Sequence, residues 1–311
     1  MVYISPALFK RQAREALRGH WLTALLIALV VNLPSLLVQG IAAFTGNDLL
    51  TRIQQAAYSA ILPGGAMVDP NALLSGLREI EQSSGIWIMQ GLNVAAWLLT
   101  PCLTLGMLAW TQGRLRGEED PGFTAVFSRM RLFFKGIGLR LYVALRVFLW
   151  MLPGVALMIL SLLPLWLSDR TSSLSILSGA NTSYGLMTAS TVVMAVLAVI
   201  AALKYALADR LLAETPEMKI TAAAKKSKEI TQGKKGLLFS LYISFVLWHL
   251  LAVMASTLCM DLLGPVAGLM IQMLASLAIT AYLETAVSAF GLWAVRPVPV
   301  TPPEEEGKSL N

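Results

Sequence analysis

The sequence predicts an all-α integral membrane protein: a polytopic bundle of six transmembrane helices with three amphipathic helices at the cytoplasmic surface. Three observations predict this fold. Of the 311 residues, 56% are hydrophobic and only 14% are charged, whereas soluble domains carry about 25% charged residues. The apolar residues form six runs, each long enough to cross a hydrocarbon core of about 30 Å. Lysine and arginine concentrate in alternate connections between these runs.

The first element is a basic helix over residues 6–18, which is expected to begin after Ser5 and to end at Gly19. The first span follows over 21–44 and contains Pro34, which predicts a kink because proline removes a helical hydrogen bond. Two short helices, 48–62 and 70–82, are expected in the polar connection that follows. The second span runs over 86–110.

A second basic helix is expected to end at Gly136, before a third span over 139–167 and a fourth over 186–208. A third basic helix should begin at Thr215 and Pro216, since threonine caps helices well and proline suits the first helical position. Gly233 should end that helix. The fifth span follows over 237–260 and the sixth over 264–293.

Each basic helix leads through a glycine into an outward span and an inward span, and this order predicts three units. The expected organisation is one integral membrane domain over 1–296, with helix-hairpin units at 1–110, 111–208 and 209–296. The proline-rich, acidic tail over 297–311 is expected to be disordered and cytoplasmic.

The distribution of positive charge predicts the orientation. One set of connections holds 20 of the 24 Lys and Arg residues, and the opposite set holds three. Positive residues near span ends are retained in the cytoplasm. Both termini are therefore expected to be cytoplasmic.

Charged residues inside the spans are the first candidates for function, because each costs about 2.5–3.5 kcal/mol at depth without a partner or a cavity. Arg146 and Glu284 lie roughly 10–14 Å from the same membrane face at 1.5 Å per residue. The matching depth predicts a buried charge pair, with Lys204 or Asp209 nearby. His249 lies near mid-membrane and is a candidate proton relay together with these two residues. A structural pair and a transport relay both remain open.

The basic helices are the candidate lipid- or partner-binding surface. Their exposed charges are Lys225, Lys226, Lys228, Lys234, Lys235, Arg11, Arg14 and Arg18. Each such residue attracts anionic lipid head groups by about 1 kcal/mol. The expected partners are membrane lipids, with anionic lipids as candidates, and a membrane protein or a second copy of the chain. The alternative, that these charges only fix orientation, stays open. No nucleic acid is expected because no stacking aromatics interleave with the lysines.

The sequence contains no HExxH, GxSxG or P-loop motif and no cluster of cysteine and histidine. It therefore predicts no enzyme, no cofactor and no metal site. The expected function is non-enzymatic binding of lipid or a partner protein at the cytoplasmic membrane surface. The alternative is a transporter or channel that uses the buried charged residues.

Residues 205–248 resemble the signature of an uncharacterised bacterial polytopic membrane family, the domain of unknown function nine-seven-five. The matching residues are Tyr205, Asp209, Pro216, Glu217, Ser227, Lys228, Gly233, Lys234 or Lys235, Phe239, Leu241, Ser244, Phe245 and Trp248. The segments AREALRGHW and LWMLPG also fit, although residues 155–204 separate the proline–glycine element from the tyrosine more widely than the family pattern does. The resemblance implies a bacterial inner-membrane protein, and a distant likeness to the membrane domain of glycerophosphodiester phosphodiesterases.

Overall fold

The computed structural model describes residues 5–45, 52–53, 75–76, 78–80, 83–161 and 173–295. In these ranges every regular element is a helix, which confirms the predicted all-α class. The elements are α1 (Pro6–Leu17), α2 (Trp21–Thr45), α5 (Ser84–Leu115), the 3-10 helix η1 (Phe123–Leu132), α6 (Phe133–Leu160), α8 (Ser173–Tyr205), α9 (Ala208–Glu214), α10 (Ile220–Thr231), α11 (Lys235–Leu263) and α12 (Pro265–Val295).

Six segments of the described chain are long and apolar enough to cross a membrane. They are Trp21–Ala42, Ser84–Leu115, Phe123–Leu160, Gly185–Glu214, Lys235–Leu263 and Val266–Val295. Each of these segments overlaps one of the six predicted spans, so the chain is a multi-pass membrane protein. The positions of α1 and α10 relative to a membrane surface stay a prediction.

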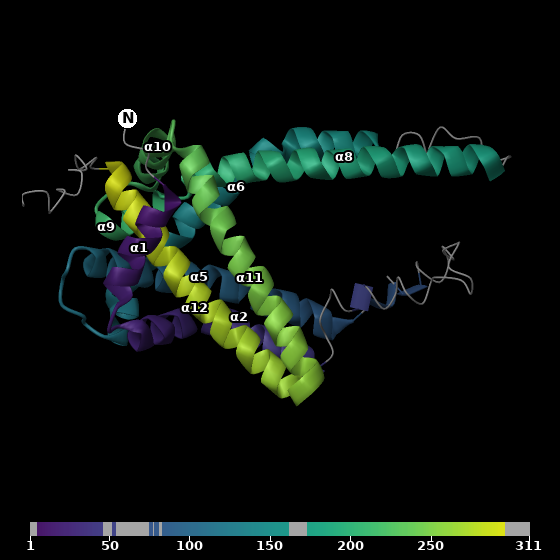
Figure 1. Ribbon diagram of the computed structural model, residues 1–311. Helices are drawn as coiled ribbons and strands as arrows, with labels where there is room; N and C mark the ends of the chain where they lie inside the picture. Colours follow the sequence, from purple (N-terminus) through teal and green to yellow (C-terminus); the bar gives the residue numbers. More distant parts are fainter. Residues whose placement is uncertain are drawn as a thin grey trace, which may run out of the picture.

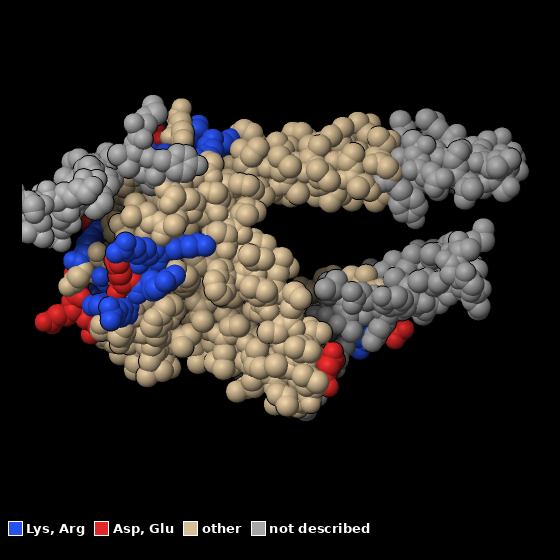
Figure 2. Space-filling model, in the orientation of Figure 1, with Lys and Arg blue, Asp and Glu red and all other residues tan. Residues whose placement is uncertain are grey.

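The long helices pack as three neighbouring pairs, α2 with α5, α6 with α8, and α11 with α12. All three pairs converge at the end of the molecule where α1, α9 and α10 lie, and they spread apart toward the other end (Figure 1). The space-filling view shows the α6–α8 pair separated by an open space from the body formed by the other pairs (Figure 2). The apolar surface of α6 therefore faces its surroundings over much of its length.

The hydrophobic core lies at the converging end. One cluster joins Phe9 of α1 with Phe290 of α12 and Leu238 of α11. A second joins α1, α2, α5, η1 and α12, and a third joins α5, α6, α9 and α10. Close backbone approach supports this packing: an added Cβ at Gly106 of α5 would lie 1.9 Å from a backbone oxygen of η1. Within the described residues, α1, η1, α9 and α10 thus join the three helix pairs at the converging end.

The expected end of a basic helix at Gly136 is wrong. The residues before it form η1, and α6 begins at Phe133 and continues through Gly136. An added Cβ at Gly136 would lie 3.1 Å from Leu105 Cδ1, so this glycine permits close packing of α6 on α5. Only Gly19 and Gly233, of the three expected stopping glycines, have the positive φ of a helix-ending turn.

The third basic helix begins later than the sequence predicts. Residues 215–218 form a turn in which Met218 N–H donates to Thr215 O, and Lys135 Nζ donates to Pro216 O at 2.7 Å. Lys219 is the N-cap of α10. The fourth span also differs from its prediction, because α8 ends at Tyr205 and the short helix α9 follows after a break.

Two predictions fall mostly outside the described residues. Of the expected helices at 48–62 and 70–82, only 52–53, 75–76 and 78–80 are described, and these are helical. The tail over 297–311 lies outside the described residues altogether.

Candidate functional site

The break between α8 and α9 interrupts a membrane-spanning segment, and α10 supplies its missing hydrogen bonds. Leu207 N–H donates to Ser227 Oγ at 3.2 Å, and the same hydroxyl donates to Lys204 O at 3.0 Å. The Thr231 hydroxyl approaches Lys204 O at 3.4 Å and donates to Ser227 O at 2.9 Å. Ser227 and Thr231 are fully buried. Irregular backbone at membrane depth requires such partners, so α10 is part of what allows the span to break here.

A buried ion pair holds the opposite side of α9. Arg210 donates through Nη2 to Glu284 Oε2 of α12 and through Nη1 to Ala206 O. Gln112 Nε2 of α5 donates to Arg210 O at 3.0 Å. The side chain of Arg210 is only 8% exposed. Removing one member of such a pair leaves a buried charge uncompensated, so α9 is fixed firmly between α5 and α12.

The predicted pair of Arg146 and Glu284 is therefore corrected. Arg146 lies on an exposed face of α6, and its guanidinium donates to Tyr142 Oη at 3.2 and 3.0 Å. Matching depth placed the two residues at one level but carried no information on which way each helix face turns. Glu284 pairs with Arg210, which the sequence reasoning missed although it stands beside Asp209 in the matched family segment.

The other predicted relay residues lie apart from this pair. His249 is exposed on α11. Lys204 is buried with its ammonium 3.3 Å from the centre of the Trp150 ring. The structure thus brings Arg146, His249 and Glu284 to three different surroundings and does not form a chain of titratable groups from them. Asp209 lies in a pocket.

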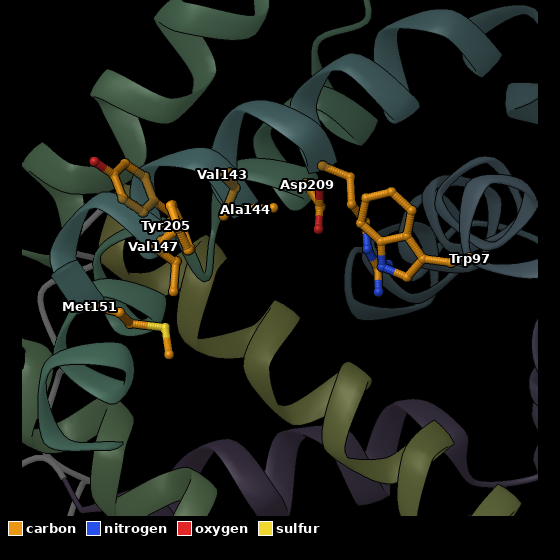
Figure 3. A pocket seen from close by; sticks show the side chains of 9 residues that line it. Trp97, Val143, Ala144, Val147, Met151, Tyr205 and Asp209 are labelled. Atoms are coloured by element: carbon orange, nitrogen blue, oxygen red, sulfur yellow. The ribbon is translucent and has the colours of Figure 1, made fainter. Parts of the chain in front are cut away.

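This pocket, here called the fork pocket, lies where α5, α6 and the α8–α9 segment diverge, and its volume is about 390 Å³. It is lined by Trp97 of α5, by Arg140, Val143, Ala144, Val147, Phe148 and Met151 of α6, by Tyr205 of α8 and by Asp209 of α9. In Figure 3 the Asp209 carboxylate points into the space between Trp97 and Tyr205, and Met151 lies farther along the wall. The pocket is apolar except at the level of Arg140 and Asp209.

One face of α6 builds the apolar wall. The positions 140, 143, 144, 147, 148 and 151 follow the three- and four-residue spacing of a single helix face. At 1.5 Å per residue this face extends about 16 Å from Arg140 to Met151. The guanidinium of Arg140 lies over the Trp97 ring, 5.6 Å from its centre. Arg140 is the second residue of the predicted third span, 139–167, and its charge was counted with those of the connection over 111–140. Its spacing from positions 143, 144, 147, 148 and 151 was the signal that could have found it.

The predicted binding lysines and arginines lie around the converging end, where Figure 2 shows blue side chains gathered. Lys225, Lys226 and Lys228 are exposed on α10, as are Arg11 and Arg14 on α1 and Arg18 at its C-cap. Lys234 is less free, since its ammonium donates to Ala294 O at 3.0 Å and lies 4.8 Å from the centre of the Trp293 ring. Lys235 is half-buried.

A second polar contact joins the start of α2 to the segment after α5. His20 Nδ1 lies 2.7 Å from Asp120 Oδ2, and Trp110 Nε1 and Gly122 N–H donate to Asp120 Oδ1 at 2.8 and 2.9 Å. Burial raises the pKa of the Asp120 carboxyl, but the hydrogen bonds from Trp110, Gly122 and His20 outweigh it and hold that pKa below its ordinary value. This contact positions the segment that leads to η1.

Comparison with known proteins identifies a family. A family model described as "Protein of unknown function (DUF975)" matches residues 7–291. The match covers the fork pocket, the first five candidate spans and the sixth as far as Gly291. Comparison with curated proteins and with solved structures found no match. The likeness to the membrane domain of glycerophosphodiester phosphodiesterases stays a prediction.

Proposed function

The chain belongs to the family described as "Protein of unknown function (DUF975)", and we propose that it is a non-enzymatic inner-membrane protein that binds a phospholipid in the fork pocket. The observation that carries this proposal is the composition of the pocket: a continuous apolar wall along α6 with Arg140 at one end. A phospholipid has the same division into an apolar chain and a charged head.

The dimensions of the pocket support a lipid chain as its occupant. The face of α6 from Arg140 to Met151 extends about 16 Å, which is about half of a hydrocarbon core of 30 Å. This is the depth that one acyl chain occupies in one leaflet. The volume of about 390 Å³ falls in the range of small-molecule sites. The wall is also open toward the surroundings, so a lipid can enter sideways from the bilayer.

Arg140 supports binding of the phosphate. Its planar guanidinium presents parallel N–H donors that match phosphate oxygens. Stacking over Trp97 orients the guanidinium without using its donors on a protein carboxylate. Within the described residues Arg140 makes no ion pair, so its charge remains available to a ligand.

The same proposal assigns the orientation. The converging end carries most of the Lys and Arg residues and is proposed to face the cytoplasm, following the positive-inside rule. Both termini then lie in the cytoplasm, and the fork pocket opens to the inner leaflet. The exposed lysines of α10 and arginines of α1 would attract anionic lipids to this face.

The geometry favours binding over transport. A transport path through the predicted relay requires a cavity that reaches Arg146, His249 and Glu284. None of these residues lines the fork pocket, and within the described part of the chain they lie in separate surroundings.

The test is phospholipid retention by the purified, delipidated full-length protein, measured by native mass spectrometry after incubation with a mixture of phosphatidylethanolamine and phosphatidylglycerol. Arg140→Gln should reduce the retained phospholipid about tenfold or more, because a charged hydrogen bond contributes about 1.5–3 kcal/mol. The matched control is Arg146→Gln, which changes an arginine of the same helix outside the pocket and should retain the wild-type level. Equal retention by the two variants, with equal melting temperatures, contradicts the proposal.

A lipid with a photoreactive acyl chain gives an independent readout. It should label the peptide that contains Val147 and Met151 in the wild-type protein and should lose this label when unlabelled phospholipid competes. Labelling restricted to the exposed faces of α2 or α11 would contradict occupancy of the pocket.

A further inference from the structure

The fork pocket contains a carboxylate as well as a cation. Asp209 and Arg140 both line it, yet they form no ion pair with each other or with another described residue. The Asp209 side chain also makes no hydrogen bond within the described part of the chain. A carboxylate at the edge of the hydrocarbon core is costly unless a cation or a donor meets it.

The two charges lie at one level of the pocket. Leu139 and Ala208, the residues that precede them, belong to the same buried cluster. Arg140 of α6 and Asp209 of α9 line the same pocket and are close enough for their charges to interact. Because Arg140 is stacked on Trp97, the pair is held apart, and space for a ligand group remains beside each charge.

The neighbouring cations Arg210 and Lys204 do not pair with the Asp209 carboxylate. Arg210 is directed to Glu284 and to the Ala206 carbonyl oxygen on the other side of α9. Lys204 is directed to the Trp150 ring. Both of these cations make their direct contacts elsewhere, so the Asp209 carboxylate remains available to a ligand group in the pocket.

Resting on the proposed function, we propose that the bound phospholipid carries a zwitterionic head group in which a phosphate meets Arg140 and a primary ammonium meets Asp209. An ethanolamine head has both groups, joined by two carbons. A glycerol head leaves Asp209 unpaired beside a phosphate. A serine head adds a carboxylate that Asp209 repels.

A choline head fits this site less well than an ethanolamine head. Its quaternary ammonium has no N–H to donate to a carboxylate and is recognised by the faces of several aromatic rings. In the fork pocket the face of Trp97 is covered by Arg140. Phe148 also lines the pocket, but it lies about 12 Å from Arg140 along α6, so Tyr205 is the aromatic wall that remains near the charged end. The hydrogen-bonding carboxylate of Asp209 is suited to a primary ammonium.

The experiment is a competition among phosphatidylethanolamine, phosphatidylglycerol and phosphatidylcholine of identical acyl chains, present in equal amounts and read by native mass spectrometry of the full-length protein. The wild-type protein should retain phosphatidylethanolamine about tenfold over each of the others. Asp209→Asn should abolish this preference and raise the share of phosphatidylglycerol, while Asp209→Glu should keep it. A preference unchanged in Asp209→Asn overturns the inference.

The two proposals fail differently. If binding depends on Arg140 but the wild-type protein retains the three lipids equally, the head-group inference is wrong and the pocket still binds phospholipid. If Arg140→Gln retains all three lipids as the wild type does, the proposed function itself is wrong. Should Asp209→Asn fail to fold, the competition with the wild-type protein alone decides, because equal retention of phosphatidylethanolamine and phosphatidylcholine contradicts a hydrogen bond from the ammonium.

Discussion

The α1–α2 and α10–α11 connections share one backbone geometry. Each begins with a helix of 12 residues. In the first, Arg18 has φ −61° and ψ 122°, and Gly19 has φ 81°; in the second, Gln232 has φ −63° and ψ 129°, and Gly233 has φ 76°. These are the angles of a type II turn, which needs glycine at its third position. The closing hydrogen bonds measure 2.9 and 3.1 Å.

The difference between the two connections lies in what the helices bury. Segments 6–19 and 220–233 align without a gap, and three buried positions coincide: Phe9 with Ala223, Ala13 with Ser227, and Leu17 with Thr231. In α1 these residues are apolar and enter hydrophobic clusters against α12 and α2. In α10 two of them are hydroxyls that bind the broken end of α8. The turn fixes the position of each helix relative to the span that follows it. The buried side chains determine whether the helix packs in an apolar cluster, as α1 does, or hydrogen-bonds the end of α8, as α10 does.

The largest expected effect is on α1. Phe9→Ala should lower the free energy of unfolding by about 3–5 kcal/mol, because the ring is fully buried against Phe290 and Trp293 and its loss leaves a cavity. Thermal unfolding in detergent measures the change. The control is Phe134→Ala, at a side chain that is 84% exposed and should change stability little. Similar losses of stability for the two substitutions would contradict this account, because α1 would then not be held in place by its buried apolar face.

The second effect tests the hydroxyl face of α10. Ser227→Ala should cost about 2–3 kcal/mol, because it leaves Leu207 N–H and Lys204 O buried without this partner. The same measurement applies, with Ser240→Ala as control, since that exposed hydroxyl bonds only within its own helix. A further consequence separates function from stability: loosening the α8–α9 break should also reduce lipid retention. If Ser227→Ala matches Ser240→Ala in both readouts, α10 is not a cap for this break.

The third effect should be the same in both connections, because it tests the turn that they share. Gly19→Ala and Gly233→Ala should each cost about 1–2 kcal/mol, because alanine at positive φ is strained although both positions have open space. Gly91→Ala, in the interior of α5 with nothing near its added methyl group, should instead stabilise by about 0.5–1 kcal/mol. Unequal losses at the two turn glycines would show that the turns are not equivalent.

The sequence predicted those features that depend on local composition. Six apolar runs predicted six membrane-spanning helices at about the right positions. Gly19 and Gly233 predicted two turns correctly, because a glycine that ends a basic helix in the left-handed conformation is a local signal. Gly136 has the same sequence context, yet its role depends on α5 packing against α6. Its function in close packing is a property of two helices, which periodicity in one of them does not contain.

The candidate site was less predictable, for a related reason. Asp209 and Glu284 were identified because charge inside a span is rare, but their partners depend on helix rotation and on the break at residues 206–207. The chosen partner, Arg146, faces outward, while Arg210 and Arg140 had been counted among connection charges. A straight-helix depth estimate cannot distinguish these arginines, since all of them lie within one to two turns of a span end.

The smallest expected effect concerns the residue that follows each turn glycine. His20 contacts the Asp120 carboxylate, whereas Lys234 contacts a backbone carbonyl oxygen. Because the pKa of Asp120 is held below its ordinary value by hydrogen bonds that outweigh burial, its contribution to stability is present above the unfolded pKa of about 3.9. That contribution is lost as the pH falls through the lower pKa of the folded state.

Melting temperatures of the wild-type protein, Asp120→Asn and Lys234→Gln between pH 6 and pH 3 measure this effect. Asp120→Asn should lower stability by about 1 kcal/mol at pH 6 and should lose less stability than the wild type on acidification. Lys234→Gln should lose as much stability as the wild type when the pH is lowered, because the contact that it removes contains no carboxylate. If the melting temperature of Asp120→Asn fell with pH as much as that of the wild type, the Asp120 contact would not distinguish the two connections. Their difference would then rest on the buried faces of α1 and α10 alone.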